Sequence, residues 1–531
     1  MFYNYYRNEN SEYDECNARG ACSIAPKISS LQEVLIVFLR QLSFYALKLD
    51  KFGENISQIS ANIVESLSTL ISTTDYTDEQ LLGLVSKQYA FLIKTKRQYL
   101  KICEERNTTC EELKFGLKIS PQMTLAGIIS QGERMFLDKY NKMSVRQKNI
   151  YEILLSVLKS VSFSLVKLRN SGNTDEAAEL EILKGLDCLN SGRISISRLK
   201  NKIKELVFLS ENVLEKIADT EMERFGAISE VEVSHSTEKG KAVLVSGGSL
   251  RELYDFLEFS KNEDIDIYTH GDLLIAHSFE KFRQFNRLKG HYGSCFEKCV
   301  LDFATFPGAI LLTKNSSQNL EYLYRGRLFS TEKFKPNGVV QVVDNDFTQV
   351  INSAKDAKGF AKGQQRESEL VGYDRNNLMA ELSTIAEKFS SNEIERLIVI
   401  GLSNHSKQQE LYFKKLFNFL PDKTFVISFS YIQNSTNSLK INIVNNQPMA
   451  YKVLKYLFEL IPVNSKRISF FITKCEAASI TKLIALKENG AKNIFISQCP
   501  PNVINPSVLS TLEKIYGIRA TTTPETDVKN L

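Results

Sequence analysis

The spacing of apolar residues changes near residue 230, and this change constrains the fold more than any other feature of the chain. From about residue 30 to residue 225 the apolar residues recur at helical spacing. Beyond residue 230, short β-branched runs alternate with helical patterns. These runs lie at residues 242–246, 265–269, 309–313, 339–343, 397–400, 425–429, 468–472 and 494–496. Apolar strands that alternate with helices are typical of parallel sheets covered by helices.

We therefore predict an α + α/β protein, with an N-terminal helical-bundle domain followed by two Rossmann-like α/β domains whose sheets are mainly parallel. A chain of 531 residues is long enough for about three domains. The predicted domains span residues 1–228, 229–370 and 371–531. Two polar stretches, 234–241 and 355–369, interrupt the pattern, and the second has the composition of a linker.

Composition excludes several other classes of protein. A net charge of +5 on 531 residues does not call for a nucleic-acid partner. The longest apolar runs, such as residues 34–39, are too short to span a bilayer, so we predict no membrane span. Residues 1–15 do not resemble a signal or transit peptide. Nine cysteines, an odd number, favour reduced thiols in an intracellular compartment.

In open α/β sheets, ligands bind beyond the carboxyl ends of the strands, so the residues that follow each predicted strand are the candidate site. They include Gly247-Gly248, His270-Gly271-Asp272, Lys314-Asn315-Ser316, Gly401-Leu402-Ser403, Ser430-Tyr431 and Thr473–Glu476. This set contains neither a dinucleotide fingerprint nor a phosphate loop. Its composition alone indicates only an α/β protein with a cleft. We expect His270 to orient the backbone of its turn and not to catalyse a reaction.

These same strand ends carry a resemblance to a known family. The runs VLVSGGSLRELYDFLE at 243–258 and IDIYTHGDLLIAH at 265–277 resemble the hybrid cluster proteins, also called prismane proteins or hydroxylamine reductases. FPGAILL at 306–312 and PPNVINPSVL at 500–509 continue the likeness. The resemblance implies two iron–sulfur centres: a 4Fe-4S cubane on four N-terminal cysteines, and a hybrid 4Fe-2S-2O cluster held by one His, two Glu and four Cys. It also implies reduction of hydroxylamine or nitric oxide.

The N-terminal segment, residues 1–30, keeps only half of the cubane ligands that the resemblance implies. Tyr3 and Tyr6 stand where the family has its first two cysteines, whereas Cys16 and Cys22 match the later pair. Two thiolates cannot hold a cubane that needs four. We therefore interpret 1–30 as a degenerate cubane segment and expect no metal there.

At the hybrid-cluster positions the chain departs further from the family. Gly248 stands in place of the His, and Asp272 replaces one Glu at the expected spacing of 24 residues. The four Cys positions fall at Ser316, Ser403, Tyr431 and Pro448, the last with an uncertainty of one residue, and only Glu476 keeps the family ligand. Serine is a poor iron ligand at neutral pH, and neither glycine nor proline offers a side-chain donor.

From these substitutions we predict a pseudoenzyme without a cofactor, kept as a structural or protein-interaction component of a larger assembly. We expect protein partners whose identity, and whether they are copies of this chain or other proteins, the sequence leaves open. The expected location is the cytoplasm or a mitochondrion-related organelle. The alternative is residual redox or metal chemistry on the same scaffold.

That alternative would use five residues that retain donor side chains: Asp272, Glu476, Cys475, Cys16 and Cys22. Against it, Lys314 or Lys474 could neutralise the two carboxylates. We also expect the rings of Tyr3, Tyr6 and Tyr431 to fill the volume of the lost clusters, because unfilled volume is destabilising.

Overall fold

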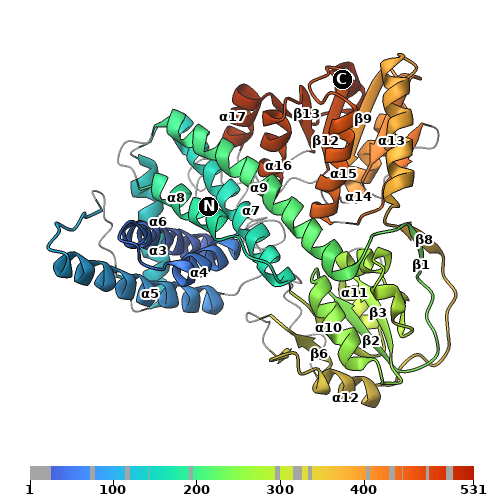
Figure 1. Cartoon of the computed structure of the whole chain (residues 1–531), viewed down its shortest axis with the longest axis horizontal. Coiled ribbons are helices and arrows are strands. Elements are labelled where there is room, and N and C mark those ends of the chain that lie inside the picture. Colours follow the sequence, from blue (N-terminus) through green and yellow to red (C-terminus); the bar gives the residue numbers. More distant parts are fainter. Residues whose placement is uncertain are drawn as a thin grey trace. The chain divides into compact units, whose positions relative to one another are not determined.

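The computed structural model of the chain combines a group of long helices with two parallel sheets (Figure 1). It describes residues 26–71, 78–113, 120–122, 124–141, 143–190, 195–293, 299–314, 326–332, 338–401, 407–429, 437–444, 446–473, 477–497 and 506–531. This arrangement confirms the predicted fold class.

Two compact units make up the chain. The first comprises Met1–Arg169, Thr174–Val213 and Phe470–Asp527, and the second comprises Asn170–Asn173, Leu214–Ser469 and Val528–Leu531. The boundaries at 228/229 and 370/371 stay a prediction.

The helical part lies between residues 26 and 225. Its helices are α3 (Pro26–Lys51), α4 (Ser57–Ser68), α5 (Asp78–Glu105), α6 (Leu125–Asn141), α7 (Val145–Ser171), α8 (Glu176–Cys188) and α9 (Ile196–Phe225). Helix α3 packs against α5, α6 and α8. Its crossing with α6 is close, because a Cβ added at Gly132 would lie 2.1 Å from the carbonyl oxygen of Ser30. Only glycine allows this approach.

Helix α7 is buried on all sides along its middle, from Asn149 to Ser162. By length and composition it is the one helix of the described chain that could cross a membrane, yet 83% of its apolar window is buried inside the protein. A helix that is covered all round by other elements is a core helix of the fold.

The first α/β sheet lies in the second unit and has the strand order β4-β3-β2-β5-β6-β7. Its strands are β2 (Ala242–Ser246), β3 (Asp266–His270), β4 (Leu288–His291), β5 (Ala309–Leu312), β6 (Leu328–Ser330) and β7 (Val340–Gln341). All neighbouring pairs are parallel. This is the strand order of Rossmann folds, and the order reverses between β2 and β5.

Helices and turns connect these strands. They are α10 (Leu250–Ser260), the 3-10 helices η2 (Gly271–Ser278) and η3 (Phe282–Gln284), α11 (Cys299–Thr305) and α12 (Thr348–Asp356). Helix α12 packs on β2 and β5 (Figure 1). Strands β2, β3 and β5 are buried at every residue, as expected of strands covered on both faces.

The second α/β sheet has the order β11-β10-β9-β12-β13-β14, which is again a Rossmann order. Its strands are β9 (Arg396–Gly401), β10 (Thr424–Ser428), β11 (Ser438–Lys440), β12 (Ile468–Ile472), β13 (Asn493–Ile496) and β14 (Ile518–Ala520). Its helices are α13 (Arg375–Ser390), α14 (Lys407–Phe417), α15 (Gln447–Leu460), α16 (Ala477–Glu488), α17 (Pro506–Tyr516) and α18 (Pro524–Lys529).

The two polar stretches pair with each other, and the prediction of a linker at 355–369 is therefore wrong. Strands β1 (Val231–Ser234) and β8 (Ser368–Val371) form an antiparallel ribbon (Figure 1). Thr237 and Gln364 exchange backbone hydrogen bonds of 2.9 Å beside it. A two-stranded ribbon leaves many side chains in water, so its polar sequence reflects exposure and not a lack of structure.

Candidate functional site

The candidate site lies at the carboxyl ends of β2, β3 and β5, where the order of the first sheet reverses. Strand β2 ends at Ser246 and is followed by Gly247 and Gly248. The N–H of Gly248 donates a hydrogen bond of 3.2 Å to the carbonyl oxygen of Lys314, which follows β5. Three of the positions singled out in the sequence, Gly248, Asp272 and Lys314, are thus placed after neighbouring parallel strands, as predicted.

His270, the last residue of β3, bridges two side chains from other elements. Its Nδ1 lies 2.9 Å from the Ser246 hydroxyl, and its Nε2 lies 3.3 Å from Oδ2 of Asp302 in α11. Ser246 and His270 are fully buried. The residue types are those of a Ser–His–Asp relay, but a serine with no exposed surface cannot meet a substrate. This arrangement instead locks β2, β3 and α11 together through side chains.

Three more histidines surround the end of β3, so this region holds four of the five histidines in the chain. The hydroxyl of Thr269 lies 2.9 Å from Nε2 of His277 and 2.9 Å from Nδ1 of His291. A hydroxyl donates one hydrogen and can accept another, so it can pair with both imidazoles at once. His235 contacts the ring of His291 edge-on and bonds Glu369 at 2.8 Å.

Burial controls the charge of His277. It lowers the pKa of His277 to about 4, with the neighbouring His235 acting in the same direction and a hydrogen bond to the Gly290 backbone opposing it. His277 is therefore neutral at neutral pH. A neutral, hydrogen-bonded His277 ring suits a packed sheet edge.

Lys314 pairs with a carboxylate that the sequence analysis did not consider. Its Nζ lies 3.3 Å from Glu252 Oε1 in α10, and its backbone N–H donates to Glu252 Oε2 at 2.8 Å. The Thr331 hydroxyl donates to the same Oε2 at 2.8 Å. Lys314 also donates to Asn170 at 3.4 Å. The ion pair of Lys314 in the described residues is thus with Glu252, and its role as the neutraliser of Asp272 or Glu476 stays a prediction.

Asp272 lies at the start of η2, one residue after Gly271. Gly271 has φ of +64°, a left-handed conformation that glycine adopts without steric cost. This turn directs the chain away from β3 and leaves the Asp272 residue half-buried.

Pro448 begins helix α15 and contributes no donor atom. The side chain of Asn446 caps this helix by accepting from the Met449 N–H at 3.0 Å. Proline suits the first turn of a helix, where its missing N–H would have no intrahelical partner. Pro448 and Met449 are both buried. At this position the chain therefore has an apolar, capped helix start.

The other predicted site positions lie outside the described residues. These are Tyr3, Tyr6, Cys16, Cys22, Ser316, Ser403, Tyr431, Lys474, Cys475 and Glu476. The roles proposed for them, including the filling of cluster volume by the three tyrosines, stay predictions. Among the residues that the structure does describe, no group of three or more His, Cys, Asp or Glu could hold a metal ion.

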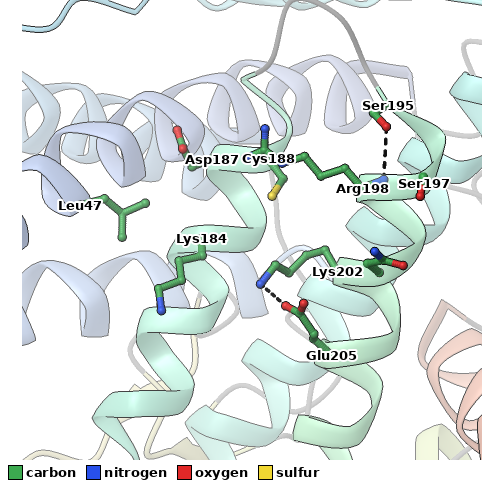
Figure 2. A pocket seen from close by; sticks show the side chains of 10 residues that line it. Leu47, Lys184, Asp187, Cys188, Ser195, Ser197, Arg198, Lys202 and Glu205 are labelled. Atoms are coloured by element: carbon green, nitrogen blue, oxygen red, sulfur yellow. Dashed lines mark hydrogen bonds and ion pairs between the residues drawn. The ribbon is translucent and has the colours of Figure 1, made fainter.

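A hollow of about 610 Å³ lies elsewhere, between α8 and α9 of the first unit (Figure 2). Lys202 crosses it and pairs with Glu205 and, at 3.0 Å, with Glu181. Burial opposes the charge of Lys202, but these two partners outweigh it and raise its pKa. Lys184 pairs with the same Glu181 at 2.7 Å. Because these cations are already matched by carboxylates, we assign the hollow no ligand.

Sequence reasoning missed several residues that organise the strand ends, among them Ser246, Asp302 and Glu252. One signal was available for Glu252. Ser249-Leu250-Arg251-Glu252 has the S-x-x-E pattern of a capping box, and Ser249 does cap α10 by accepting from the Glu252 N–H at 3.4 Å. No spacing rule connects Ser246 with Asp302, which is 56 residues away in the chain.

Comparison with known proteins extends the resemblance over the whole chain. A hydroxylamine reductase from Rhodospirillum rubrum is 26% identical to this chain. The alignment is 531 positions long and covers 97% of each chain. A solved structure of the alpha subunits of acetyl-CoA synthase/carbon monoxide dehydrogenase, with NiZn[Fe4S4] and NiNi[Fe4S4] clusters, is 10% identical, with a TM-score of 0.47 over 95% of this chain and 82% of that one. The sequence model of the Prismane/CO dehydrogenase family matches residues 10–446. The chain therefore belongs to the Prismane/CO dehydrogenase family.

Proposed function

We propose that this protein is a pseudoenzyme of the hydroxylamine reductase scaffold that binds no iron–sulfur cluster and serves as a structural or protein-interaction component of a larger assembly. The proposal combines the family, whose scaffold is that of an oxidoreductase, with the side chains present at the positions where the family holds its hybrid cluster.

The observation that carries the proposal is the donor set at those positions. Gly248 and Pro448 offer no donor side chain, and Ser316, Ser403 and Tyr431 offer hydroxyls in place of thiolates. Iron–sulfur clusters are held by soft, charged thiolates. Asp272 reaches about 1.5 Å less far than the Glu of the family, the length of one carbon–carbon bond. These residues do not fit the hybrid cluster, and we derive no reaction step through it.

The contacts of the described positions support this reading. The Gly248 N–H is engaged by the Lys314 carbonyl, and Pro448 is buried in the capped first turn of α15. Lys314 itself pairs with Glu252. Gly248 and Lys314 bond to other residues of the protein, and Pro448 is packed in a helix start. These positions are therefore engaged in contacts within the protein.

The activity test is a direct comparison with the Rhodospirillum rubrum relative. Both proteins are purified without oxygen and assayed for hydroxylamine-dependent oxidation of reduced methyl viologen. We expect turnover by the relative and none by this chain. Turnover by this chain at a comparable rate would overturn the proposal.

The same preparation tests the alternative of a hard-metal site. Zinc or manganese bound in a one-to-one ratio, and lost in the Asp272→Asn variant, would assign metal chemistry to the carboxylate that remains after β3. We expect metal content at background in both the wild-type protein and the variant, because the described residues include no group of three or more His, Cys, Asp or Glu that could hold such an ion.

The assembly role is tested by native mass. The chain has a mass of 60.3 kDa, and we expect native extract prepared at low salt to contain it in a larger particle of defined stoichiometry. Cross-linking followed by mass spectrometry then identifies the neighbouring chains. A protein that runs as a 60.3 kDa monomer in native extract would contradict the assembly role.

A further inference from the structure

Two cysteines meet at the end of helix α5, outside the strand-end site. Cys103 lies in the last turn of α5, is buried, and is a free thiol. Cys110 follows seven residues later, is half-buried, and is also a free thiol. The segment between them reads Glu-Glu-Arg-Asn-Thr-Thr.

The chain reverses direction between the two cysteines. Asn107 has φ of +48°, the left-handed conformation in which helices commonly end. The Thr108 N–H donates to the Cys103 carbonyl at 2.9 Å, and the Asn107 N–H donates to the Glu104 carbonyl at 3.1 Å. These two bonds form a Schellman motif, which folds the following residues back over the end of the helix.

A second anchor holds the returning segment in place. The Glu111 N–H donates to the Tyr99 hydroxyl at 2.8 Å. Tyr99 lies one turn before Cys103 on the same face of α5. Its ring is buried against Phe52, with centroids 6.0 Å apart, and Glu111 pairs with Lys48 of α3. Because Cys110 directly precedes Glu111, this anchor brings Cys110 over the face that carries Cys103.

The two thiols are in contact. The turn at Asn107 and the Glu111–Tyr99 anchor bring the Cys110 thiol beside Cys103, and the Cys103 side chain is the largest cause of the raised pKa of Cys110, which is about 11. Burial and the nearby charge of Glu112 act in the same direction. Cys103 is also hydrogen-bonded to the Tyr99 hydroxyl.

We propose that Cys103 and Cys110 are a modification site, a dithiol that peroxides convert reversibly to an intramolecular disulfide. The site is independent of the strand ends and of the function proposed for them. The half-buried Cys110 is the thiol that meets the oxidant, and the buried Cys103 is the thiol that resolves the product.

The chemistry balances with hydrogen peroxide as the oxidant. The Cys110 thiolate attacks one peroxide oxygen, the O–O bond breaks, and the leaving hydroxide takes up the proton released by the thiol to give water. The Cys103 thiolate then attacks the sulfur of the Cys110 sulfenic acid. The S–S bond forms, the S–O bond breaks, and hydroxide leaves as a second water after taking up the Cys103 proton. The two sulfurs together lose two electrons, and the peroxide gains two.

The raised pKa of Cys110 makes this a slow site at neutral pH, because the thiolate is the reactive form. The oxidation rate should therefore rise with pH between 7 and 9, by about tenfold for each pH unit while the thiol form still predominates. The titratable groups beside the pair are Tyr99 and Glu112, while Glu111 bonds Tyr99 and Lys48 pairs with Glu111.

Trypsin separates the two cysteines and makes the test direct. Cleavage after Lys101, Arg106 and Lys114 releases residues 102–106 with Cys103 and residues 107–114 with Cys110. The reduced full-length protein is treated with hydrogen peroxide and then denatured in the presence of N-ethylmaleimide, which blocks the remaining free thiols. It is then digested with trypsin. We expect a pair of peptides, 102–106 and 107–114, joined by a disulfide and released by reduction.

Serine variants identify the role of each thiol. Cys103→Ser should abolish the joined peptides and leave a Cys110 sulfenic acid that dimedone traps. Cys110→Ser should abolish the joined peptides and leave Cys103 unmodified by dimedone. The matched control is Cys188→Ser, which removes another buried free thiol and should leave the yield of joined peptides unchanged.

A probe that needs no oxidant checks the geometry. Phenylarsine oxide bridges closely spaced thiols, so we expect it to bind the reduced wild-type protein at this pair in a one-to-one ratio. We expect no binding at this position in either single variant. The proposal fails if N-ethylmaleimide labels both cysteines fully after peroxide treatment. It also fails if dimedone labels Cys103 in the Cys110→Ser variant, or if the arsenical binding survives in either variant.

Discussion

The strand ends of the first sheet and the end of helix α5 both gather side chains of reactive types, but they use them differently. At the strand ends, Ser246, His270 and Asp302 form a chain of hydrogen bonds in which Ser246 and His270 have no exposed surface. At the end of α5, the free thiols of Cys103 and Cys110 are neighbours, and Cys110 keeps some contact with solvent. Closeness of reactive groups is common to both regions, and access of a reactant distinguishes them.

This difference bears on how a site should be recognised in a member of an enzyme family. The strand ends are where an α/β fold concentrates its ligands, yet in this chain their polar groups hold neighbouring elements together. The thiol pair lies instead at the end of helix α5.

Glu252→Ala should have the largest effect on stability. Glu252 is buried and binds the Lys314 ammonium, the Lys314 N–H and the Thr331 hydroxyl. Its loss leaves these groups without their acceptor, and we expect the free energy of unfolding to fall by about 3 kcal/mol. Urea denaturation measures this change.

The control for this variant lies on the same helix. Glu258 pairs with Lys261 at 3.2 Å on the exposed surface, so Glu258→Ala should change the stability by less than about 0.5 kcal/mol. Equal effects of the two substitutions would show that the strand-end network does not stabilise the fold.

His277 should make the strand ends sensitive to acid. Its pKa is about 4 in the folded protein, below the ordinary value of 6.5, so the unfolded chain binds more protons between these values. The stabilising contribution of the neutral ring is complete above pH 6.5 and is lost as the pH falls toward 4. The loss is about 3 kcal/mol at most.

The comparison with His277→Gln isolates this contribution. We expect the stability difference between the wild-type protein and the variant to shrink as the pH falls from 7 to 4. The wild-type profile alone is not sufficient, because burial raises the pKa of Glu211 in α9 to about 7 and this carboxyl has the opposite dependence. A difference that stays constant across this range would contradict the neutral state of His277.

Oxidation of the thiol pair should stabilise the protein moderately. A disulfide between Cys103 and Cys110 closes a short loop, for which chain entropy predicts about 2 kcal/mol. We expect the peroxide-treated wild-type protein to unfold at a higher urea concentration than the reduced protein. Cys110→Ser treated in the same way should show no shift.

Ser246→Ala should have the smallest effect. It removes the hydroxyl that holds His270 Nδ1 at 2.9 Å while Asp302 still holds Nε2. One buried ring nitrogen then lacks its partner, and we expect a loss of about 1–2 kcal/mol. Ser260→Ala is the control, because the Ser260 hydroxyl bonds only its own helix, at 2.7 Å to the Phe256 carbonyl. If Ser246→Ala lowers the free energy of unfolding no more than Ser260→Ala does, the Ser246–His270 hydrogen bond does not stabilise the fold.

Much of the fold could be predicted from the sequence, because its central strands are short, mostly apolar runs. The runs at 242–246 and 468–472 match β2 and β12 residue for residue. The edge strands β4, β11 and β14 were missed, since three or four residues give no readable periodicity. The β1–β8 ribbon was taken for a polar gap and a linker because its residues are exposed.

The candidate site was predictable only in part. The residues after β2, β3 and β5 could be named because strand ends follow directly from strand assignments. The partners that define their roles could not be named. Glu252 meets Lys314 across 62 residues of sequence and Asp302 meets His270 across 32, and no local pattern encodes such contacts. The thiol pair was missed for a different reason, because the chain reversal depends on the left-handed Asn107.

The central claim is that the scaffold is kept without its iron. The most direct measurement is iron analysis together with the visible spectrum of protein purified without oxygen, after incubation with ferrous iron and sulfide under reducing conditions. The account predicts a colourless, folded protein with iron well below one equivalent. Stoichiometric iron with thiolate-to-iron charge-transfer bands in the visible region would contradict it.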